Sequence, residues 1–112
     1  MEEQLDSGPI YEVLKEKILH NDTYSSLSNR LSELGSEFVI NFLKTSEISS
    51  PRAQDVTGVT YAGKILKCET KIDWHEPAQK IDCKIRGLSE RPGAWTNING
   101  ERIKILSSTL VE

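Results

Sequence analysis

The stretch TYSSLSNRLSELGSEFVINFLK, residues 23–44, carries the clearest structural signal in this chain of 112 residues. Its apolar side chains recur at spacings of three and four, which places them on one side of a helix. They are Tyr24, Leu27, Leu31, Leu34, Phe38 and Phe42. Asp22 and Thr23 offer oxygens that can cap the first free backbone N–H groups. We therefore predict an amphipathic helix of about twenty residues, whose apolar stripe needs a partner surface that the rest of the chain hardly supplies.

The segments on either side of this helix have weaker patterns. The turn-rich residues LDSGPI, 5–10, precede a mixed stretch in which we predict a strand near Ile10–Lys15. Residues 45–58 contain serines, Pro51 and Gly58 with almost no apolar pattern, which is typical of a linker. A short extended segment is expected at Val59–Ala62, with Tyr61 as a half-buried strand residue.

The last third predicts a second helix and a hairpin. Pro77 suits the first turn of a helix, Ala78, Ile81 and Ile85 would form its buried face, and Gly87 would end it. Asn99-Gly100 between the β-prone residues 94–96 and 103–106 is a strong signal for a two-residue hairpin turn. A two-stranded hairpin is marginal on its own, so we expect the chain to be the middle of a larger fold.

Composition narrows the function classes. With 37% hydrophobic and 28% charged residues the chain is typical of a soluble globular protein. It has no apolar run near the roughly 20 residues that cross a bilayer, and Met1–Gln4 lacks the features of a signal peptide. Cys68 and Cys83 are isolated, so reduced thiols in the cytoplasm are expected and a zinc site is not.

Charge is unevenly distributed along the chain. The net charge is −3, but residues 1–60 hold 5 Lys/Arg and 10 Asp/Glu, whereas residues 61–112 hold 9 and 7. This asymmetry indicates either a polyanion contact confined to the second half or merely a solvated charged face.

Three stretches together resemble methionyl-tRNA formyltransferases. They are LDSGPI at 5–10, the segment VTYAGKILK at 59–67 with Glu69 and IDW at 72–74, and IRG at 85–87 with PGAWT at 92–96. The first is shared with other folate-dependent formyltransferases, while the second and third are specific in combination.

The resemblance implies an α/β fold class with a carboxyl-terminal barrel. Residues 1–44 would end a Rossmann-like catalytic domain, residues 45–75 would be the linker, and residues 76–112 would start a β-barrel of OB type. The implied activity is transfer of a formyl group from 10-formyltetrahydrofolate to the methionine amine of initiator methionyl-tRNA, in translation initiation. The resemblance further implies a cytoplasmic enzyme without a metal, acting as a monomer.

The implied catalytic residue is Asp6, with Leu5, Ser7 and Gly8 in the folate-site loop. In the family an asparagine and a histidine share the chemistry with this aspartate, but His20 and His75 do not follow an asparagine at the required spacing. We therefore expect no activity from the chain alone. Without the resemblance, Asp6 would be interpreted as a turn- or helix-capping carboxylate.

The implied tRNA contacts are Lys64, Lys67, Lys71 and Arg86. Lysine suits phosphate as a compact point charge, although the three lysines could also be a solvated loop and Arg86 a helix-end cation. Trp74 and Trp95 are expected to pack in a core or domain interface rather than to stack on bases.

One departure from the family pattern and two alternative functions remain. Residues 89–92, SERP, replace the family's usual N-P-W-P, and Arg91 in place of tryptophan is expected to weaken packing or to mark relaxed selection. The alternatives are a small tRNA- or RNA-binding module and a fragment of a sugar-nucleotide formyltransferase. The stretch from Tyr61 to Trp74 argues against the latter.

Overall fold

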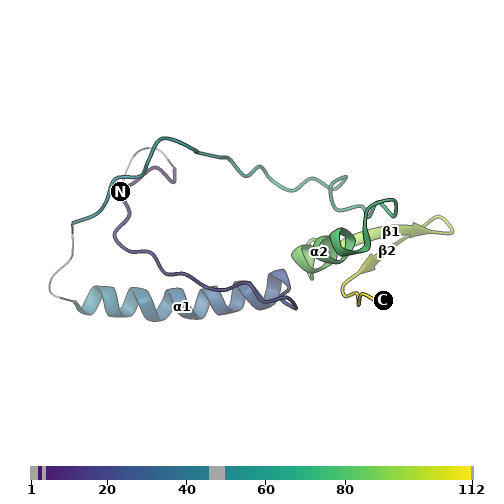
Figure 1. Ribbon diagram of the computed structural model, residues 1–112, viewed down its shortest axis with the longest axis horizontal. Helices are drawn as coiled ribbons and strands as arrows, with labels where there is room; N and C mark the ends of the chain where they lie inside the picture. The colour runs from purple at the N-terminus through teal and green to yellow at the C-terminus, as the bar shows by residue number, and fades with distance from the viewer. Residues whose placement is uncertain (1–2, 4, 46–49, 112) are drawn as a thin grey trace.

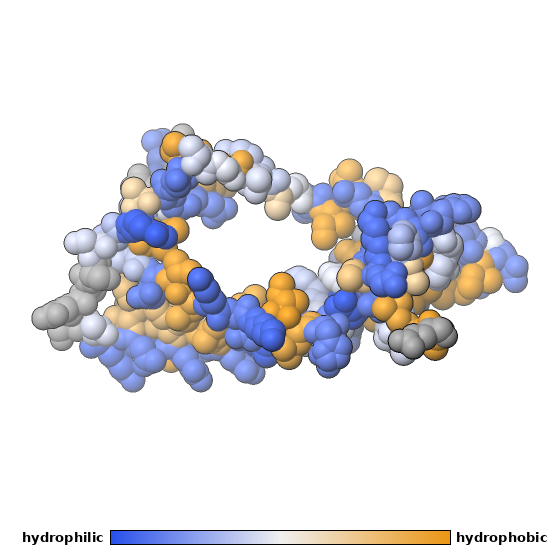
Figure 2. All heavy atoms as spheres, viewed as in Figure 1, coloured by the Kyte–Doolittle hydropathy of each residue, from blue (hydrophilic) through white to orange (hydrophobic). Residues whose placement is uncertain are grey.

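The computed structural model describes residues 3, 5–45 and 50–111. Its elements are the helices α1 (Tyr24–Lys44) and α2 (Ala78–Leu88), followed by the strands β1 (Ala94–Ile98) and β2 (Glu101–Ile105). The molecule is elongated, 61 × 26 × 25 Å, with α1 in one half of its length and α2 with the strands in the other (Figure 1). The connection after residue 50 returns along the opposite side, and Figure 2 shows an opening between this connection and α1.

Helix α1 begins where the sequence predicts it. The Thr23 hydroxyl accepts a hydrogen bond from the Ser26 backbone N–H at 3.2 Å, and the Ser26 hydroxyl accepts one from the Thr23 N–H at 3.0 Å. This reciprocal capping satisfies two N–H groups that the helix leaves free. The predicted amphipathic helix is thereby confirmed.

The apolar stripe of α1 has little to pack against in the described chain. None of its residues is buried; Leu27, Leu34, Phe38 and Phe42 are half-buried, whereas Tyr24 and Leu31 are exposed. The preceding segment runs back along the helix (Figure 1), where the Tyr11 ring meets the Phe42 ring edge-on at 5.6 Å. The shortage of partner surface is confirmed as well.

Neither of the two stretches predicted to be extended forms a strand. Ile10–Lys15 forms no strand, because its β pairing is one isolated bridge in which Ile10 and Arg52 exchange two backbone hydrogen bonds of 2.8 Å. A strand needs a ladder of such pairs, which the described chain does not supply. Val59–Ala62 forms no strand either, and Tyr61 is 95% exposed rather than half-buried.

The hydrophobic core lies between α2 and the hairpin. It consists of Ile72, Ile81, Ile85, Leu88 and Ala94, with Ile105 packed against it. Burying an isoleucine contributes about 1.5–3 kcal/mol relative to leaving it exposed, so this cluster holds together one half of the molecule only. The predicted helix is confirmed with two changes: Ala78 is exposed, and the helix runs one residue past Gly87 so that Leu88 is buried.

The predicted hairpin is confirmed. β1 and β2 pair antiparallel with Ile98 opposite Glu101, and the turn residues Asn99 and Gly100 have φ of 52° and 88°. Positive φ at both positions is what a two-residue hairpin turn of this kind requires. With α2 the hairpin makes a small α/β unit. Within the described residues no helix is long and apolar enough to span a membrane, and no group of three or more His, Cys, Asp or Glu could hold a metal ion.

Candidate nucleic-acid interface

A basic groove lies between the turn at residues 65–70 and the outer face of the hairpin. It has a volume of about 610 Å³, and apolar residues with Thr70 form part of its lining. The remaining lining residues are all cationic and exposed: Lys67, Arg91, Arg102 and Lys104. Such a cluster favours a phosphate-bearing ligand, because each cation can displace the counterions that accompany a phosphate.

The strand register explains why these cations gather. Trp95 in β1 lies directly opposite Lys104 in β2. Arg102 is two residues from Lys104 in β2, so the side chains of all three lie on the same outer face. Ala94 and Thr96 alternate with Trp95 and turn toward the core, where they are buried. The guanidinium carbon of Arg102 lies 4.4 Å from the centroid of the Trp95 ring, and the Lys71 Nζ lies 5.7 Å from it. Both distances are within the range of cation–π attraction.

Trp95 is held by the segment that precedes α2. Its backbone N–H donates to the Thr70 carbonyl at 3.0 Å, and its carbonyl accepts from the Ile72 N–H at 2.8 Å. Its indole N–H donates to the Thr70 hydroxyl at 3.1 Å and to the Lys67 carbonyl at 3.3 Å. These bonds fix the ring against residues 67–72.

Sequence reasoning found part of this groove. Lys67 lines it and Lys71 lies against Trp95, whereas Lys64 is exposed but does not line the groove. Arg102 and Lys104 were missed, although the alternating residues ERIKI at 101–105 could have revealed a basic outer face. Arg91, expected only to weaken packing, is an exposed cation at the groove.

The two tryptophans differ in their surroundings. Trp74 is 57% exposed, with its indole N–H donating to the Thr96 hydroxyl at 2.9 Å. Trp95 is half-buried. Both indole N–H groups are therefore satisfied within the chain, as is usual for tryptophans that pack with a polar edge.

Arg86 lies at a joint between the two halves of the molecule. Its Nε donates to the Asp82 carboxylate and its Nη1 to the Asp22 carbonyl, both at 2.9 Å. The bond to Asp82 raises the pKa of Arg86. The sequence suggests either a tRNA contact or a cation bonded to free carbonyls at the end of its own helix. In the structure Arg86 does bond a backbone carbonyl, but this carbonyl belongs to Asp22, which precedes the Thr23 cap of α1.

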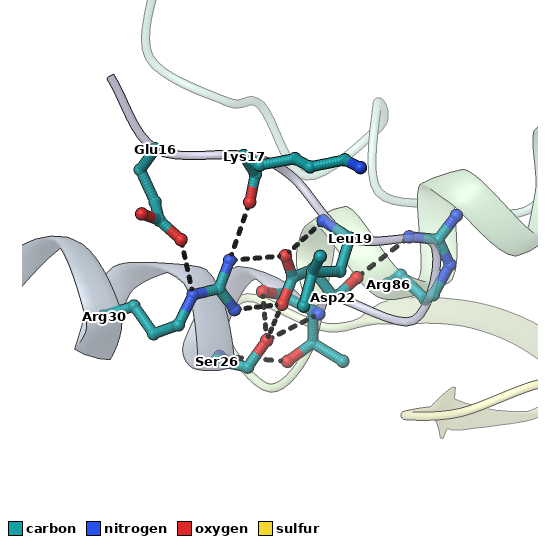
Figure 3. A network of polar contacts seen from close by, with 8 residues as sticks. Glu16, Lys17, Leu19, Asp22, Ser26, Arg30 and Arg86 are labelled. Atoms are coloured by element: carbon teal, nitrogen blue, oxygen red, sulfur yellow. Dashed lines mark hydrogen bonds and ion pairs between the residues drawn. The ribbon is translucent and has the colours of Figure 1, made fainter.

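Asp22 is the centre of this joint (Figure 3). Its carboxylate accepts from the Arg30 guanidinium, from the Leu19 N–H at 2.7 Å and from the Ser26 hydroxyl at 2.8 Å. The bonds from Arg30, followed by that from Leu19, hold the pKa of Asp22 well below its ordinary range. Ser25 completes the joint, since its N–H and hydroxyl donate to the Ser89 carbonyl at the end of α2.

The loop that contains Asp6 lies in the other half of the molecule from the groove (Figure 1). Asp6 has φ of 58°, and the Gln54 side chain donates to the Asp6 and Gly8 carbonyls at 2.9 and 2.7 Å. Leu5, Asp6 and Ser7 are exposed, and none of them lines the neighbouring hollow formed by Ile10 and residues 52–55. The structure thus keeps residues 5–8 together but brings none of the predicted tRNA contacts near them. Gln54 was missed because its partners are more than forty residues away in the sequence.

Known proteins resemble both this groove region and the whole chain. Residues 64–112 match the family model described as formyl transferase, C-terminal domain. Over all 112 residues the chain is 46% identical to a methionyl-tRNA formyltransferase of Cereibacter sphaeroides and 45% identical to one of Ruegeria pomeroyi. One of Paracoccus denitrificans is 44% identical over 98% of the chain. The chain spans about 37% of the length of these relatives. Residues 64–112 therefore resemble the formyl transferase C-terminal domain family, and the resemblance to methionyl-tRNA formyltransferases is confirmed over the whole chain.

Proposed function

We propose that this chain is part of a methionyl-tRNA formyltransferase and supplies its linker and tRNA-contacting region. The observation that carries the proposal is the identity of 43–46% with proteins of that name over nearly the whole chain. The complete enzyme would transfer a formyl group from 10-formyltetrahydrofolate to the methionine amine of initiator tRNA in the cytoplasm, as a monomer. Residues 1–44 would complete a Rossmann-like domain, and residues 76–112 would begin a barrel of OB type after the linker at 45–75.

Asp6 would be this chain's contribution to the chemistry. An attacking amine must lose a proton, and a carboxylate can position a histidine and relay that proton through water. The Gln54 bonds to the Asp6 and Gly8 carbonyls support a fixed loop of this kind. The chain has no Asn-x-His element, and residues 5–8, of which Leu5, Asp6 and Ser7 are exposed, do not enclose a folate. The chain alone would therefore not formylate, and the donor would bind mainly to the rest of the enzyme.

The basic groove would receive the phosphate backbone of the tRNA. Lys67 and Lys71 would act there with Arg91, Arg102 and Lys104, and Lys64 would extend the charge along the connection. Arg86 would assist tRNA binding by holding the joint, since its bonds to Asp82 and Asp22 already use its Nε and Nη1. Charge contacts of this type contribute affinity and little sequence reading.

Reconstitution tests the proposed activity. The purified chain would be mixed with the parts of the Cereibacter sphaeroides relative that this chain does not match. Formylation of initiator methionyl-tRNA by 10-formyltetrahydrofolate would then be measured. We expect no turnover from the chain alone, turnover from the mixture, and a loss of at least about 100-fold with Asp6→Asn, the scale of one general acid–base group.

Asp55→Asn is the matched control, because Asp55 is an exposed aspartate near the same loop, and its carboxylate accepts from the N–H and the hydroxyl of Thr57 in its own turn. It should leave turnover of the mixture unchanged. Turnover by the chain alone, or full activity of the Asp6→Asn mixture, would contradict the proposal.

A small RNA-binding module is the second candidate, and the basic groove favours it. Salt-sensitive tRNA binding by the chain, without any gain of activity on reconstitution, would support this alternative. A sugar-nucleotide formyltransferase is disfavoured by residues 59–74 and would be recognised by formylation of an amino sugar nucleotide in the same mixture.

A further inference from the structure

We infer that Trp95 is a positioning residue that holds the Arg102 guanidinium at the rim of the basic groove, where Arg102 contacts the RNA phosphate backbone. The inference rests on the tRNA contact of the proposed function and deepens it. It assigns the ring of Trp95 to an arginine of its own chain instead of to a stacked base.

The ring of Trp95 is fixed before any ligand arrives. Thr70 is 2% exposed, and its hydroxyl donates to the Lys67 carbonyl at 2.9 Å, which leaves a lone pair directed to the Trp95 indole N–H. The backbone N–H and carbonyl of Trp95 are both hydrogen-bonded, to residues 70 and 72. A rigid ring is a suitable platform, because it can restrict a long side chain without being displaced itself.

Arg102 differs from the arginines of the joint. Arg30 and Arg86 direct their donors to carboxylates and backbone carbonyls of the chain. In the described part of the chain Arg102 has no ion pair or side-chain hydrogen bond, and its guanidinium lies 4.4 Å from the Trp95 centroid. A stacked guanidinium keeps its N–H groups at its edge, where they can form paired bonds to phosphate oxygens. Stacking on Trp95 therefore orients Arg102 while leaving its donors available.

The neighbouring cations direct the ligand to the same place. Lys67 and Arg91 line the groove with Arg102, and the Lys71 amine lies 5.7 Å from the Trp95 ring. With two cations already within contact range of the ring, phosphate contact is favoured over base stacking. Binding should consequently depend strongly on salt and weakly on base sequence.

A double-mutant cycle in the full chain tests the inference. Affinity for unformylated initiator tRNA would be measured between 50 and 300 mM salt for Trp95→Leu, Arg102→Gln and the double variant. We expect Arg102→Gln to weaken binding several-fold and to reduce the salt slope by about one. Trp95→Leu should weaken binding in the wild-type background but hardly at all once Arg102 is replaced.

Arg91→Gln is the matched control, since Arg91 lies on the same groove without a ring contact, and its effect should add to that of Trp95→Leu. Trp95→Phe should retain most of the affinity. Arg102→Lys should keep the salt slope but lose affinity, because a lysine does not present a planar fork. Trp74 fluorescence reports whether the hairpin remains folded, since the indole N–H of Trp74 bonds Thr96 in β1.

The outcomes separate clearly. Additive effects of Trp95→Leu and Arg102→Gln would overturn the inference and favour Trp95 as a platform for a stacked base. Unchanged binding by Arg102→Gln would also overturn it, because Arg102 would then make no contact with the RNA. If Trp95→Leu does not fold, Thr70→Val takes its place, because it removes the closer of the two acceptors of the indole N–H. The same non-additivity with Arg102→Gln is expected. Absence of tRNA binding by the wild-type chain would also overturn it, while the formylation mixture decides the proposed activity independently.

Discussion

Asp22 connects three parts of the chain at the joint through its side chain and its backbone carbonyl. Its carboxylate binds Arg30 and the Leu19 N–H, and its carbonyl accepts from Arg86 of the second helix. Its ordinary pKa of 3.8 is lowered chiefly by the hydrogen bonds from Arg30. A carboxyl whose pKa is lower in the folded state stabilises the fold above the unfolded pKa. That contribution is lost as the pH falls below about 4 and through the folded pKa.

Replacing Arg30 by glutamine should therefore shift the Asp22 titration. In a carbon-detected NMR titration, the Asp22 carboxyl of the wild-type chain should titrate well below 3.8 and move toward 3.8 in Arg30→Gln. The joint of the variant should also become less sensitive to acid between pH 4 and 2. Asp55 serves as an internal control, because its pKa is lowered by the Thr57 backbone N–H and does not involve Arg30. If the titration midpoint of Asp22 is the same in both proteins, then Arg30 and Asp22 are not paired in solution.

The backbone conformation at Gly93 favours glycine over any other residue. It has φ of 84°, and a Cβ there would lie 3.1 Å from the Lys104 Cδ and 3.3 Å from the Glu90 carbonyl oxygen. Gly93→Ala should destabilise the hairpin unit by more than the roughly 1–2 kcal/mol that a left-handed backbone conformation costs an L-residue. Urea unfolding followed by tryptophan fluorescence would measure this loss.

Two glycines of the same unit provide matched comparisons for Gly93→Ala. Gly100 has φ of 88° with open space around it, so Gly100→Ala should show the backbone cost alone. Gly87 is helical with open space, so Gly87→Ala should be neutral or should stabilise by about 0.5–1 kcal/mol. Equal losses at Gly93 and Gly100 would mean that the Lys104 side chain moves aside without cost.

The first helix depends on its cap more than a packed helix would, because none of its residues is buried. Thr23→Ala removes the acceptor for the Ser26 N–H, and loss of such a cap typically costs about 1 kcal/mol. We expect a clear decrease in the helical circular dichroism signal of the chain. Ser28→Ala is the control, since Ser28 is exposed on the same helix and alanine is the better helix former. An unchanged signal in Thr23→Ala would show that segment 10–22, rather than the cap, holds the helix.

Elements with local causes could be predicted from sequence, and elements that need a distant partner could not. The first helix follows from the Thr23 cap and the apolar spacing, and the hairpin follows from Asn99-Gly100, all within a few residues. The strand predicted at Ile10–Lys15 depended on a neighbouring strand, and the described chain offers only Arg52. Tyr61 has the composition of a strand residue but likewise no partner.

The groove shows the same division. Lys67 and Lys71 were predicted because they lie in the segment where the resembled family presents basic residues to the tRNA. Arg102 and Lys104 reach the groove through strand register, and Arg91 reaches it through the turn before β1. The alternation at residues 101–105 indicates a basic face, but not the residues across the groove that this face meets. The role of Thr70 depends on a contact across 25 residues, for which the sequence contains no local signal.

At the scale of the whole molecule, the described residues form one hydrophobic core at one end, and the first helix at the other end has no buried residue. The core residues all lie between positions 72 and 94, with Ile105 beside them, and the joint that links this unit to the first helix is polar. A few hydrogen bonds and ion pairs of this kind contribute a smaller net free energy than a buried apolar core. Hence the two halves of the described chain should unfold separately.

Two spectroscopic probes can test that expectation, because each reports on one half. Trp74 and Trp95 both lie in the unit with the core, whereas the longer helix, 21 residues against 11, contributes most of the far-ultraviolet circular dichroism signal. We expect the circular dichroism signal to fall gradually and at lower temperature, and tryptophan fluorescence to change later and more cooperatively. Arg86→Gln should increase the temperature difference between the two transitions, since it removes the hydrogen bond from the second helix to the Asp22 carbonyl. If the two signals change together in both the wild-type chain and Arg86→Gln, the two halves form one cooperative unit, although the apolar stripe of the first helix is largely uncovered.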